Sequence, residues 1–375
     1  MAGKQTRRMA SAAGAFLKRY RKQHGLTQEQ LASDLNIEPR TLRAYENGER
    51  SLHDINELYR IADRLGVEPE QLGVVGRLHP PRSPQDIEEL LTHAWSLVEA
   101  ARLYEARAVI EHLTQSLSRQ ITGEQPELLR ALARSYHTAG YIVSLATRAP
   151  SSQEALIYYR NLEEVARLLR DDTLLAIALT YQGDLHRRLG HLEQATLYLE
   201  AARDTTPQAD QAARGNALQL LARTYLRRGE VARFETAMRQ AEELAPVGFD
   251  PSSSTHGCYS LGTVYEEYGR SYADMGQPVK AMEFLQRAET HLPSTPHWRL
   301  LVETAKMLAL IKGNEFEAGI TLALALVEEI RRCGTLRYLD RLYLANRFLK
   351  EQEQRIGKAS AALNEALLLE GAPDY

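Results

Sequence analysis

In this 375-residue sequence, arginine, whose side chain can bind anionic groups, recurs at matched positions of a repeated pattern. Arg134, Arg223 and Arg270 each directly follow a small residue, in segments that share one pattern of small and aromatic residues. Because a guanidinium binds a carboxylate through two parallel hydrogen bonds, three such arginines on one face would form a ladder for anionic groups. The pattern therefore predicts a surface that holds an extended peptide by its backbone and its anionic groups.

Polar residues at neighbouring positions extend this predicted surface. The candidate ligand-binding residues are Arg134, Thr180, Asp184, Arg187, Asn216, Gln219, Arg223, Arg227, Glu266 and Arg270. The alternative is that Asp184 and Glu266 neutralise the arginines and that the surface is only solvated. Most of the 18 tyrosines, in contrast, fall at positions where repeats pack together and are predicted to lie in the core.

Other reactive residues form no catalytic pattern. The histidines are scattered without paired acids or a nucleophile, and neither the P-loop motif nor G-x-S-x-G occurs. Cys258 and Cys333 lie far apart, with no further cysteine or histidine at metal-binding spacing, which argues against a disulfide framework or a zinc site. The chain is therefore predicted to be no enzyme and to hold no metal and no cofactor.

The arginine positions belong to a pattern that repeats along the chain. Its clear copies comprise Gly183, His186, Gly190, Ala195, Leu199, Ala202 and Pro207; Ala222, Tyr225, Gly229, Phe234, Met238, Ala241 and Pro246; and Gly269, Tyr272, Gly276, Ala281, Leu285, Ala288 and Pro293. This spacing is typical of tetratricopeptide repeats, in which small residues let two antiparallel helices approach closely. With weaker copies on both sides and terminal helix pairs at 85–120 and 336–369, we predict roughly seven helix pairs in a right-handed superhelix. The first helix of each pair would line its concave groove.

Two segments of the sequence fall outside the predicted helix pairs. Residues 73–84 contain two glycines and three prolines, as expected of a semi-rigid spacer. We therefore predict a domain at 1–73, a linker at 74–84 and a repeat domain at 85–375. The longest loop between repeats, 247–260, is interpreted as a tolerated surface insertion, with a lid or a partner contact as the alternative.

Residues 12–72 follow a different pattern, that of five short helices. Thr27 and Gln30 predict a capping box at the start of the second helix, Asn36 a tight left-handed turn, and Pro39 the first position of the third helix. Residues 1–25 carry seven lysines and arginines and no acidic residue, which favours contact with nucleic acid. Two short helices joined by a three-residue turn are the arrangement that presents one helix to a DNA groove.

The string GLTQEQLASDLNIEPRTLRAYENGE, residues 25–49, resembles the lambda-repressor-like (Xre-type) helix-turn-helix family. By this resemblance Gln28 contacts a phosphate, while Pro39, Arg40, Arg43 and Ala44 face the major groove. Of these, Arg40 and Arg43 can read guanine O6 and N7, each good pair giving about 1–3 kcal/mol of discrimination. The alternative is that both contact only phosphates.

Two residues depart from the family pattern. Glu38 stands where a small hydroxyl residue is usual, so its charge opposes phosphate contact while suiting a helix N-terminus. Asn36 replaces the commoner glycine. Arg21 and Glu46 match a family pair that joins the first helix to the end of the third. Because one such head buries little DNA surface, we predict a homodimer on a two-fold site.

Composition fits a soluble protein. Hydrophobic residues make up 44% of the chain and charged residues 25%, with a mean hydropathy of -0.39. No apolar run approaches the ~18 residues that are needed to cross a bilayer. The basic N-terminus leads into a charged helix and not into an apolar signal segment, so we expect a cytoplasmic protein.

An Xre-type head followed by tetratricopeptide repeats resembles the peptide-pheromone receptors of Gram-positive bacteria (the RRNPP class). The resemblance implies an all-α transcription regulator of quorum sensing that binds double-stranded DNA and a short signalling peptide. The peptide would lie in the concave groove and change the geometry of the two heads in a homodimer. Two alternatives are a scaffold that docks a protein partner and a constitutive repressor that uses its repeats only for dimerisation.

Overall fold

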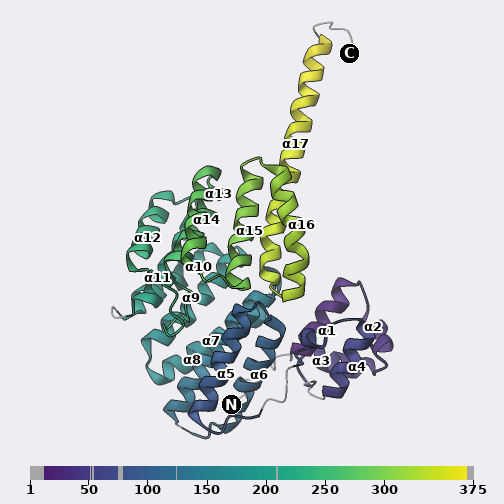
Figure 1. The fold of residues 1–375 in the computed structure, drawn as a ribbon, viewed down its shortest axis with the longest axis vertical. Coiled ribbons are helices and arrows are strands. Elements are labelled where there is room, and N and C mark those ends of the chain that lie inside the picture. The colour runs from purple at the N-terminus through teal and green to yellow at the C-terminus, as the bar shows by residue number, and fades with distance from the viewer. Residues whose placement is uncertain are drawn as a thin grey trace.

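The computed structural model describes residues 12–50, 52, 55–74, 79–123, 125–207 and 210–369. Within these ranges every regular element is a helix, and no strand occurs. A small head and a larger repeat body lie side by side (Figure 1). The prediction of an all-α protein with a helix-turn-helix head and a helical-repeat body is confirmed.

The head consists of α1 (Ala12–Gln23), α2 (Gln28–Leu35), α3 (Pro39–Glu46), α4 (Ile55–Leu65) and the 3-10 turn η1 (Pro69–Leu72). Thr27 and Gln30 form the predicted capping box, and Asn36 is left-handed with φ of 53°. The fifth helix that the sequence predicts is only this 3-10 turn, since Gly73, with φ of 79°, ends it after four residues. Leu17, Leu31 and Leu42 are fully buried in the core between these elements.

The body contains six antiparallel helix pairs in its described part. They are α5 (Pro84–Glu99) with α6 (Leu103–Gln120), α7 (Pro126–Ala146) with α8 (Gln153–Leu169), α9 (Asp172–Leu189) with α10 (Leu192–Thr205), α11 (Gln211–Arg227) with α12 (Val231–Leu244), α13 (Leu261–Asp274) with α14 (Pro278–His291), and α15 (Pro296–Lys312) with α16 (Phe316–Cys333). The short turn η2 (Ala149–Ser151) joins α7 to α8.

The predicted helix pair at 336–369 is wrong. Residues 336–369 form the 3-10 turn η3 (Leu336–Tyr338) and one continuous helix, α17 (Leu339–Leu369). The single glycine in this helix, Gly357, has open space around it and does not break the helix. The body therefore has six pairs and a long terminal helix.

Small residues at the matched repeat positions lie where two helices meet. A Cβ atom added to Gly183 of α9 would come within 2.6 Å of Leu199 Cγ on α10. At the equivalent position of the later repeat, a Cβ on Gly269 would come within 2.6 Å of Leu285 Cγ. The spacing of the small residues thus encodes the close approach within each pair.

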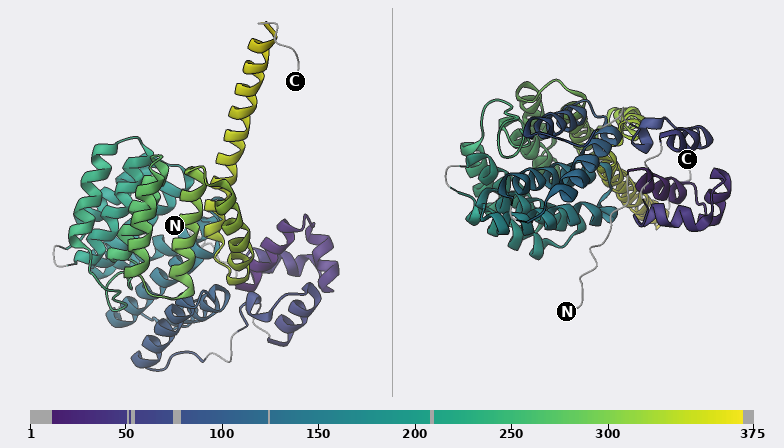
Figure 2. Two further views of the ribbon diagram at one scale, coloured as in Figure 1. Left: turned by 45° about the horizontal axis from the view of Figure 1, so that its top comes forward. Right: turned by 90° about the horizontal axis from the view of Figure 1, so that it is seen from below.

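The superhelix curls until its two ends touch (Figure 2). Glu99, at the end of α5, accepts hydrogen bonds from Thr295 Oγ1 at 2.7 Å and from Trp298 Nε1 of α15 at 3.1 Å. Burial raises the pKa of this carboxyl above its ordinary value. The first helices of the pairs therefore enclose an interior and do not form an open arc.

The loop at 247–260 is not the surface insertion that the sequence favours. Tyr259 is 1% exposed and fits against Gly215 of α11. The His256 ring stacks on Trp95 of α5, with centroids 4.8 Å apart, and lies 5.5 Å from the His137 ring of α7. The loop thus fills space on the inner side of the early repeats.

The head contacts the body through α1 and η1, which lie against α6. The Phe16 ring packs edge-on against Tyr104, with centroids 6.2 Å apart, and the Arg19 guanidinium lies 5.5 Å from the Tyr104 centroid. Arg19 also donates a hydrogen bond of 3.4 Å to the Ala146 carbonyl at the end of α7.

Among the described helices, none has the length and apolar character that a membrane-spanning helix needs.

Candidate functional site

The first candidate site is the exposed face of α3 in the head. Pro39, Arg40 and Arg43 are exposed and Ala44 is partly exposed, so all four predicted groove-facing residues are open to solvent. Leu42 and Tyr45 on the opposite face are buried in the head core. The amphipathic sequence of α3 therefore turns both arginines outward, toward the solvent-exposed face of the head.

A chain of hydrogen bonds fixes this helix to its neighbours. Arg21 of α1 donates to Glu46 Oε1 from Nε at 2.6 Å and to Oε2 from Nη2 at 2.8 Å. Gln28 donates to the same carboxylate at 2.8 Å, and its own carbonyl oxygen accepts from Arg43 Nε at 3.2 Å. The predicted Arg21–Glu46 pair thus exists, and it links α1 and α2 to the end of α3.

Burial alone would raise the pKa of Glu46, but the hydrogen bonds from Arg21 and Gln28 outweigh it and lower that pKa. The carboxylate is 1% exposed and stays charged at neutral pH. Gln28, the predicted phosphate contact, also positions Arg43 in the DNA-free protein. Glu38 occupies the N-cap of α3, and its side chain makes no capping hydrogen bond.

The second candidate site is the inner face of the repeat body. The ten predicted ligand-binding residues lie on α7, α9, α11 and α13, all of which are first helices of pairs. Those that are buried are Thr180, Asp184, Arg187, Asn216, Gln219, Arg223 and Glu266. Arg134, Arg227 and Arg270 are more accessible, and Arg134 pairs with Glu88 of α5.

The arginines of the predicted ladder are paired with acids. Arg223 lies 2.5 Å from Glu267 Oε1 and 3.3 Å from Asp274. Arg270 lies 3.3 Å from Glu267 and 3.5 Å from Glu266. Within one protomer, these contacts agree with the alternative that acids neutralise the ladder, although Glu267 supplies more of the charge than the predicted Asp184.

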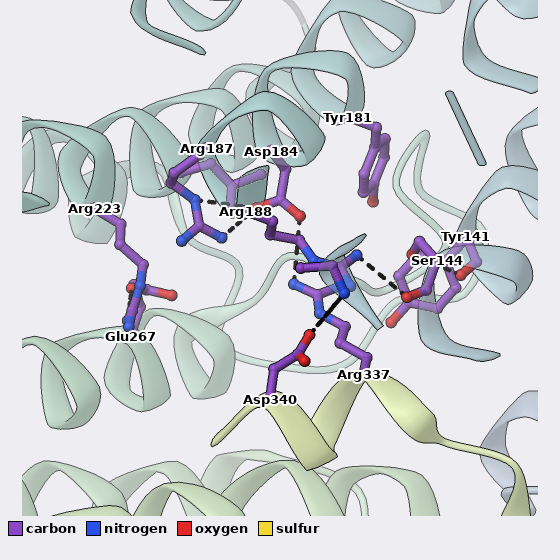
Figure 3. A network of polar contacts seen from close by, with 12 residues as sticks. Tyr141, Ser144, Tyr181, Asp184, Arg187, Arg188, Arg223, Glu267, Arg337 and Asp340 are labelled. Carbon is purple, nitrogen blue, oxygen red and sulfur yellow. Dashed lines mark hydrogen bonds and ion pairs between the residues drawn. The ribbon is translucent and has the colours of Figure 1, made fainter. Parts of the chain in front are cut away.

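The C-terminal segment completes the network, which the sequence did not predict (Figure 3). Arg337 of η3 reaches Asp184 at 3.4 Å, where Arg187 also pairs with that carboxylate. Asp340 accepts from Arg148 Nε at 2.9 Å and lies 4.0 Å from Arg188. The pairs that Arg337 and Asp340 make join residues far apart in the chain, so local spacing gives no signal for them.

Arg341, in the first turn of α17, is the most enclosed of the arginines in this C-terminal segment. It donates to Glu266 Oε1 at 2.9 Å, to the Leu301 carbonyl at 2.6 Å and to Thr304 Oγ1 at 2.8 Å. Burial lowers its pKa to about 10. The start of α17 is therefore fastened to α13 and α15 from within the ring.

Positive charge exceeds negative charge in this network. Arg187, Arg188, Arg223, Arg227, Arg270, Arg337 and Arg341 face Asp184, Glu266, Glu267, Asp274 and Asp340. Burial lowers the pKa of Arg188 to about 9 and that of Arg187 to about 10. The Arg187 and Arg188 guanidinium groups are thus incompletely compensated, and a ligand anion would be favourable beside them.

Several buried polar atoms on the inner face have no hydrogen-bond partner within the described chain. They are Thr180 Oγ1, Gln219 Oε1, Arg223 Nε, Ser271 Oγ and His137 Nε2. A buried polar group without a partner costs roughly 1–3 kcal/mol, so these atoms are suited to hydrogen-bond a ligand.

In the described residues, no group of three or more histidine, cysteine or acidic side chains is arranged to hold a metal ion.

Residues 14–73 match the family model of a helix-turn-helix domain. The chain therefore carries an N-terminal domain of a DNA-binding fold, which is not the fold of an enzyme. No curated protein matches the chain.

Several solved structures are similar to this chain. Bacillus thuringiensis PlcR in complex with the peptide PapR7 and DNA is 14% identical, covering 75% of this chain and 97% of that chain with a TM-score of 0.39. The apo form of the competence regulator ComR from Streptococcus vestibularis is 18% identical, covering 81% and 98% with a TM-score of 0.39. ComR from S. thermophilus in complex with DNA and its signalling peptide ComS is 17% identical, covering 80% and 99% with a TM-score of 0.36.

Proposed function

We propose that this chain is a cytoplasmic transcription regulator that binds specific DNA sites as a homodimer. Its repeat body binds a short signalling peptide on the inner face, and binding changes the geometry of the two heads. The observation that carries the DNA-binding part is the solvent-exposed pair Arg40 and Arg43 on α3 of a helix-turn-helix domain.

The DNA-binding part is tested by comparing specific and random DNA. A target is first selected from a random duplex library, and affinities of the variants Arg40→Ala and Arg43→Ala are then measured by fluorescence anisotropy. Loss of a base contact should cost about 1–3 kcal/mol on the selected site and less on random DNA. Equal loss on both DNAs would assign the two arginines to phosphate contact.

Arg239→Ala is the matched control for this test. Arg239 is an exposed arginine on α12, on the side of the body away from the head (Figure 1). Its removal changes the net charge by the same amount as either head variant. We expect unchanged affinity for the selected site, since no α12 residue is near the DNA-facing helix.

The peptide-binding part rests on the spare hydrogen-bonding capacity and the excess guanidinium charge of the inner face. Reversing Arg223 and Arg270 together would test it poorly, because both pair with buried Glu267 and their reversal would unfold the body. Thr180→Val is a sharper change, since it removes a hydroxyl that has no partner in the described chain and keeps the side-chain shape.

The ligand is first isolated by incubating the purified protein with peptides from a cell lysate and identifying by mass spectrometry those that co-elute. Thr180→Val should then bind the isolated peptide more weakly while keeping its thermal midpoint. Thr236→Val, the same substitution on the outward-facing side of α12, serves as the control. If no peptide co-elutes, the sensing part of the proposal is wrong while DNA binding by the head stands.

Two other roles lead to different outcomes in the same experiments. A scaffold that docks a protein partner would retain a protein and no peptide. A constitutive repressor would bind its DNA site equally well with and without the co-eluting fraction. Only a change in DNA affinity on adding the peptide supports the sensing regulator.

A further inference from the structure

Residues 250–258, which we call the inner segment, form the middle of the loop between α12 and α13. An aromatic side chain anchors the chain on each side of it. The Phe249 ring packs edge-on against Trp298 of α15, with centroids 5.9 Å apart. The Tyr259 hydroxyl donates a hydrogen bond to the Ala241 carbonyl of α12. The inner segment is therefore a short stretch of chain between two fixed points.

His256 is the residue through which the inner segment contacts the early repeats. Its ring stacks on Trp95 of α5, with centroids 4.8 Å apart, and lies 5.5 Å from the His137 ring of α7. Its backbone is left-handed, with φ of 50°, a conformation that is unfavourable for a residue with a side chain. The contacts of the imidazole ring therefore hold a backbone that would otherwise relax.

The groups that face His256 do not suit a positive charge. Arg134 and His137 face it from α7. The acidic group on the α5 side is Glu88, which already accepts a hydrogen bond of 2.9 Å from Arg134 Nη2. Cys258, on the segment itself, is neutral because burial raises the pKa of its thiol to about 12. A proton on His256 would thus lie beside a guanidinium and a second imidazole.

Both imidazoles are uncharged in this arrangement. Burial and the Arg134 charge lower the pKa of His256 to about 4, although a hydrogen bond to the Pro251 carbonyl acts in the opposite direction. Burial, together with His256 and Arg134, also lowers the pKa of His137. Either ring would bind a proton more readily in water than in its place inside the ring of helices.

The inner segment covers polar groups with which it does not pair. Trp95 Nε1 and His137 Nε2 are buried and have no hydrogen-bond partner in the described chain. Tyr141 and Tyr181, which hydrogen-bond Cys258, stay protonated because burial raises their pKa well above the ordinary value. Departure of the segment would therefore open a surface with free hydrogen-bonding groups.

We propose that the inner segment is an acid-released latch, which covers the inner face while His256 is neutral and leaves it when His256 is protonated. The latch would control access to the ligand-binding surface, since Arg134 of that surface lies one turn before His137 on α7. The inference deepens the proposed function and rests on it only in taking the inner face as the place where a ligand binds.

The sign of the pH response follows from the two pKa values of His256. Above the ordinary histidine pKa of 6.5, the ring is neutral whether the segment is closed or open, so the contacts with Trp95 and His137 keep it closed. Below 6.5, an exposed His256 binds a proton that the closed arrangement, with a pKa of about 4, does not bind. By pH 5 this difference favours opening by about 30-fold relative to neutral pH.

The test is amide hydrogen exchange of the full chain at pH 7.5 and pH 5 without any peptide. Labelling times are scaled to the intrinsic exchange rate at each pH. Protection of the inner segment reports its opening, and protection of α9 reports the fold of the ring. We expect the opening equilibrium of the wild-type segment to rise at least about tenfold at pH 5, while α9 stays protected.

Two variants of His256 and one control identify the titrating group. His256→Phe keeps an aromatic ring on Trp95, and His256→Asn suits the left-handed backbone, but neither side chain can be protonated. In both variants the ratio of opening at the two pH values should be smaller than in the wild type by about tenfold, even if the segment is more open at both. His93→Phe, at an exposed position of α5, should respond as the wild type does.

Three results would overturn the latch. The segment could stay closed at pH 5, it could open to the same extent in the wild type and both His256 variants, or α9 could lose its protection because acid unfolds the whole ring. None of these results decides whether the inner face binds a peptide, since no peptide is present. The co-elution experiment, carried out at both pH values, decides that separately.

Discussion

Arg341 of α17 lies 2.9 Å from the Glu266 carboxylate of α13, and this ion pair joins the last helix to the inner face of the ring. Both side chains are almost fully buried. The pair therefore links the proposed ligand-binding face to the start of α17. A ligand that moves one of these two residues would therefore also act on the other.

Replacing Arg341 by methionine should destabilise the body strongly. Removing one partner of a buried ion pair leaves the other charge insufficiently compensated, which costs about 3–5 kcal/mol in the free energy of unfolding. Urea denaturation followed by tryptophan fluorescence measures this change. Arg347→Met, at an exposed position six residues further along α17, should shift the free energy of unfolding by about 0.5 kcal/mol or less. Equal effects of the two substitutions would show that the Glu266 pair is not important for stability.

Glu46→Gln should loosen the head and change its response to acid. The pKa of Glu46 lies below its ordinary value of 4.5, because the hydrogen bonds from Arg21 and Gln28 outweigh burial. A lowered carboxyl pKa stabilises the folded state above the ordinary pKa, and this contribution is lost as the pH falls through the folded-state pKa. The wild-type head should therefore be more stable than the variant by about 1–3 kcal/mol at pH 7, and the difference should shrink below about pH 4.5.

Amide hydrogen exchange of α1, α2 and α3 in the full chain measures this head stability. Glu49→Gln, an exposed glutamate just beyond α3, is the matched control. A difference between wild type and Glu46→Gln that stays constant from pH 7 to pH 3 would contradict the assignment to the Glu46 carboxylate.

Cys258 should react slowly with a thiol reagent until the loop at 247–260 opens. Burial raises the pKa of its thiol to about 12, and the Tyr141 and Tyr181 hydroxyls hydrogen-bond it. Since the thiolate is the reactive form, modification at pH 8 requires the loop to leave the inner face. Mass spectrometry of the modified peptide measures the rate. If peptide binding displaces this loop, adding the peptide should accelerate modification of Cys258, while unchanged kinetics would show that the loop stays in place.

The sequence predicts best what local spacing determines. The capping box at Thr27, the left-handed Asn36 and the helix pairing at Gly183 all depend on residues that lie close together in the chain, so periodicity and turn chemistry reveal them. The ion pair between Asp184 and Arg337 spans 153 residues, and that between Glu266 and Arg341 spans 75. No local pattern encodes such contacts, because they depend on how far the superhelix curls.

The same limit explains the error at the C-terminus. Residues 336–369 show helical periodicity, and a pair of helices is the usual way for a repeat array to end. The chain forms a second antiparallel helix only where residues that end a helix interrupt the first one. The exposed Gly357 alone does not end α17. The ten candidate ligand-binding residues lie on first helices of the pairs. The contacts of Asp184 with Arg337 and of Glu266 with Arg341, in contrast, depend on the closed ring.

Gly183→Ala tests whether close packing within a repeat determines the stability of the body. The added Cβ would lie 2.6 Å from Leu199 Cγ, so the two helices must separate or Leu199 must leave its rotamer. Overpacking of this kind costs about 1–3 kcal/mol. Gly357→Ala makes the same change where no atom lies within 4 Å, and there alanine should stabilise the helix by about 0.5–1 kcal/mol. Thermal unfolding of both variants should therefore show shifts of opposite sign, and a stabilising effect at Gly183 would refute the tight approach of α9 and α10.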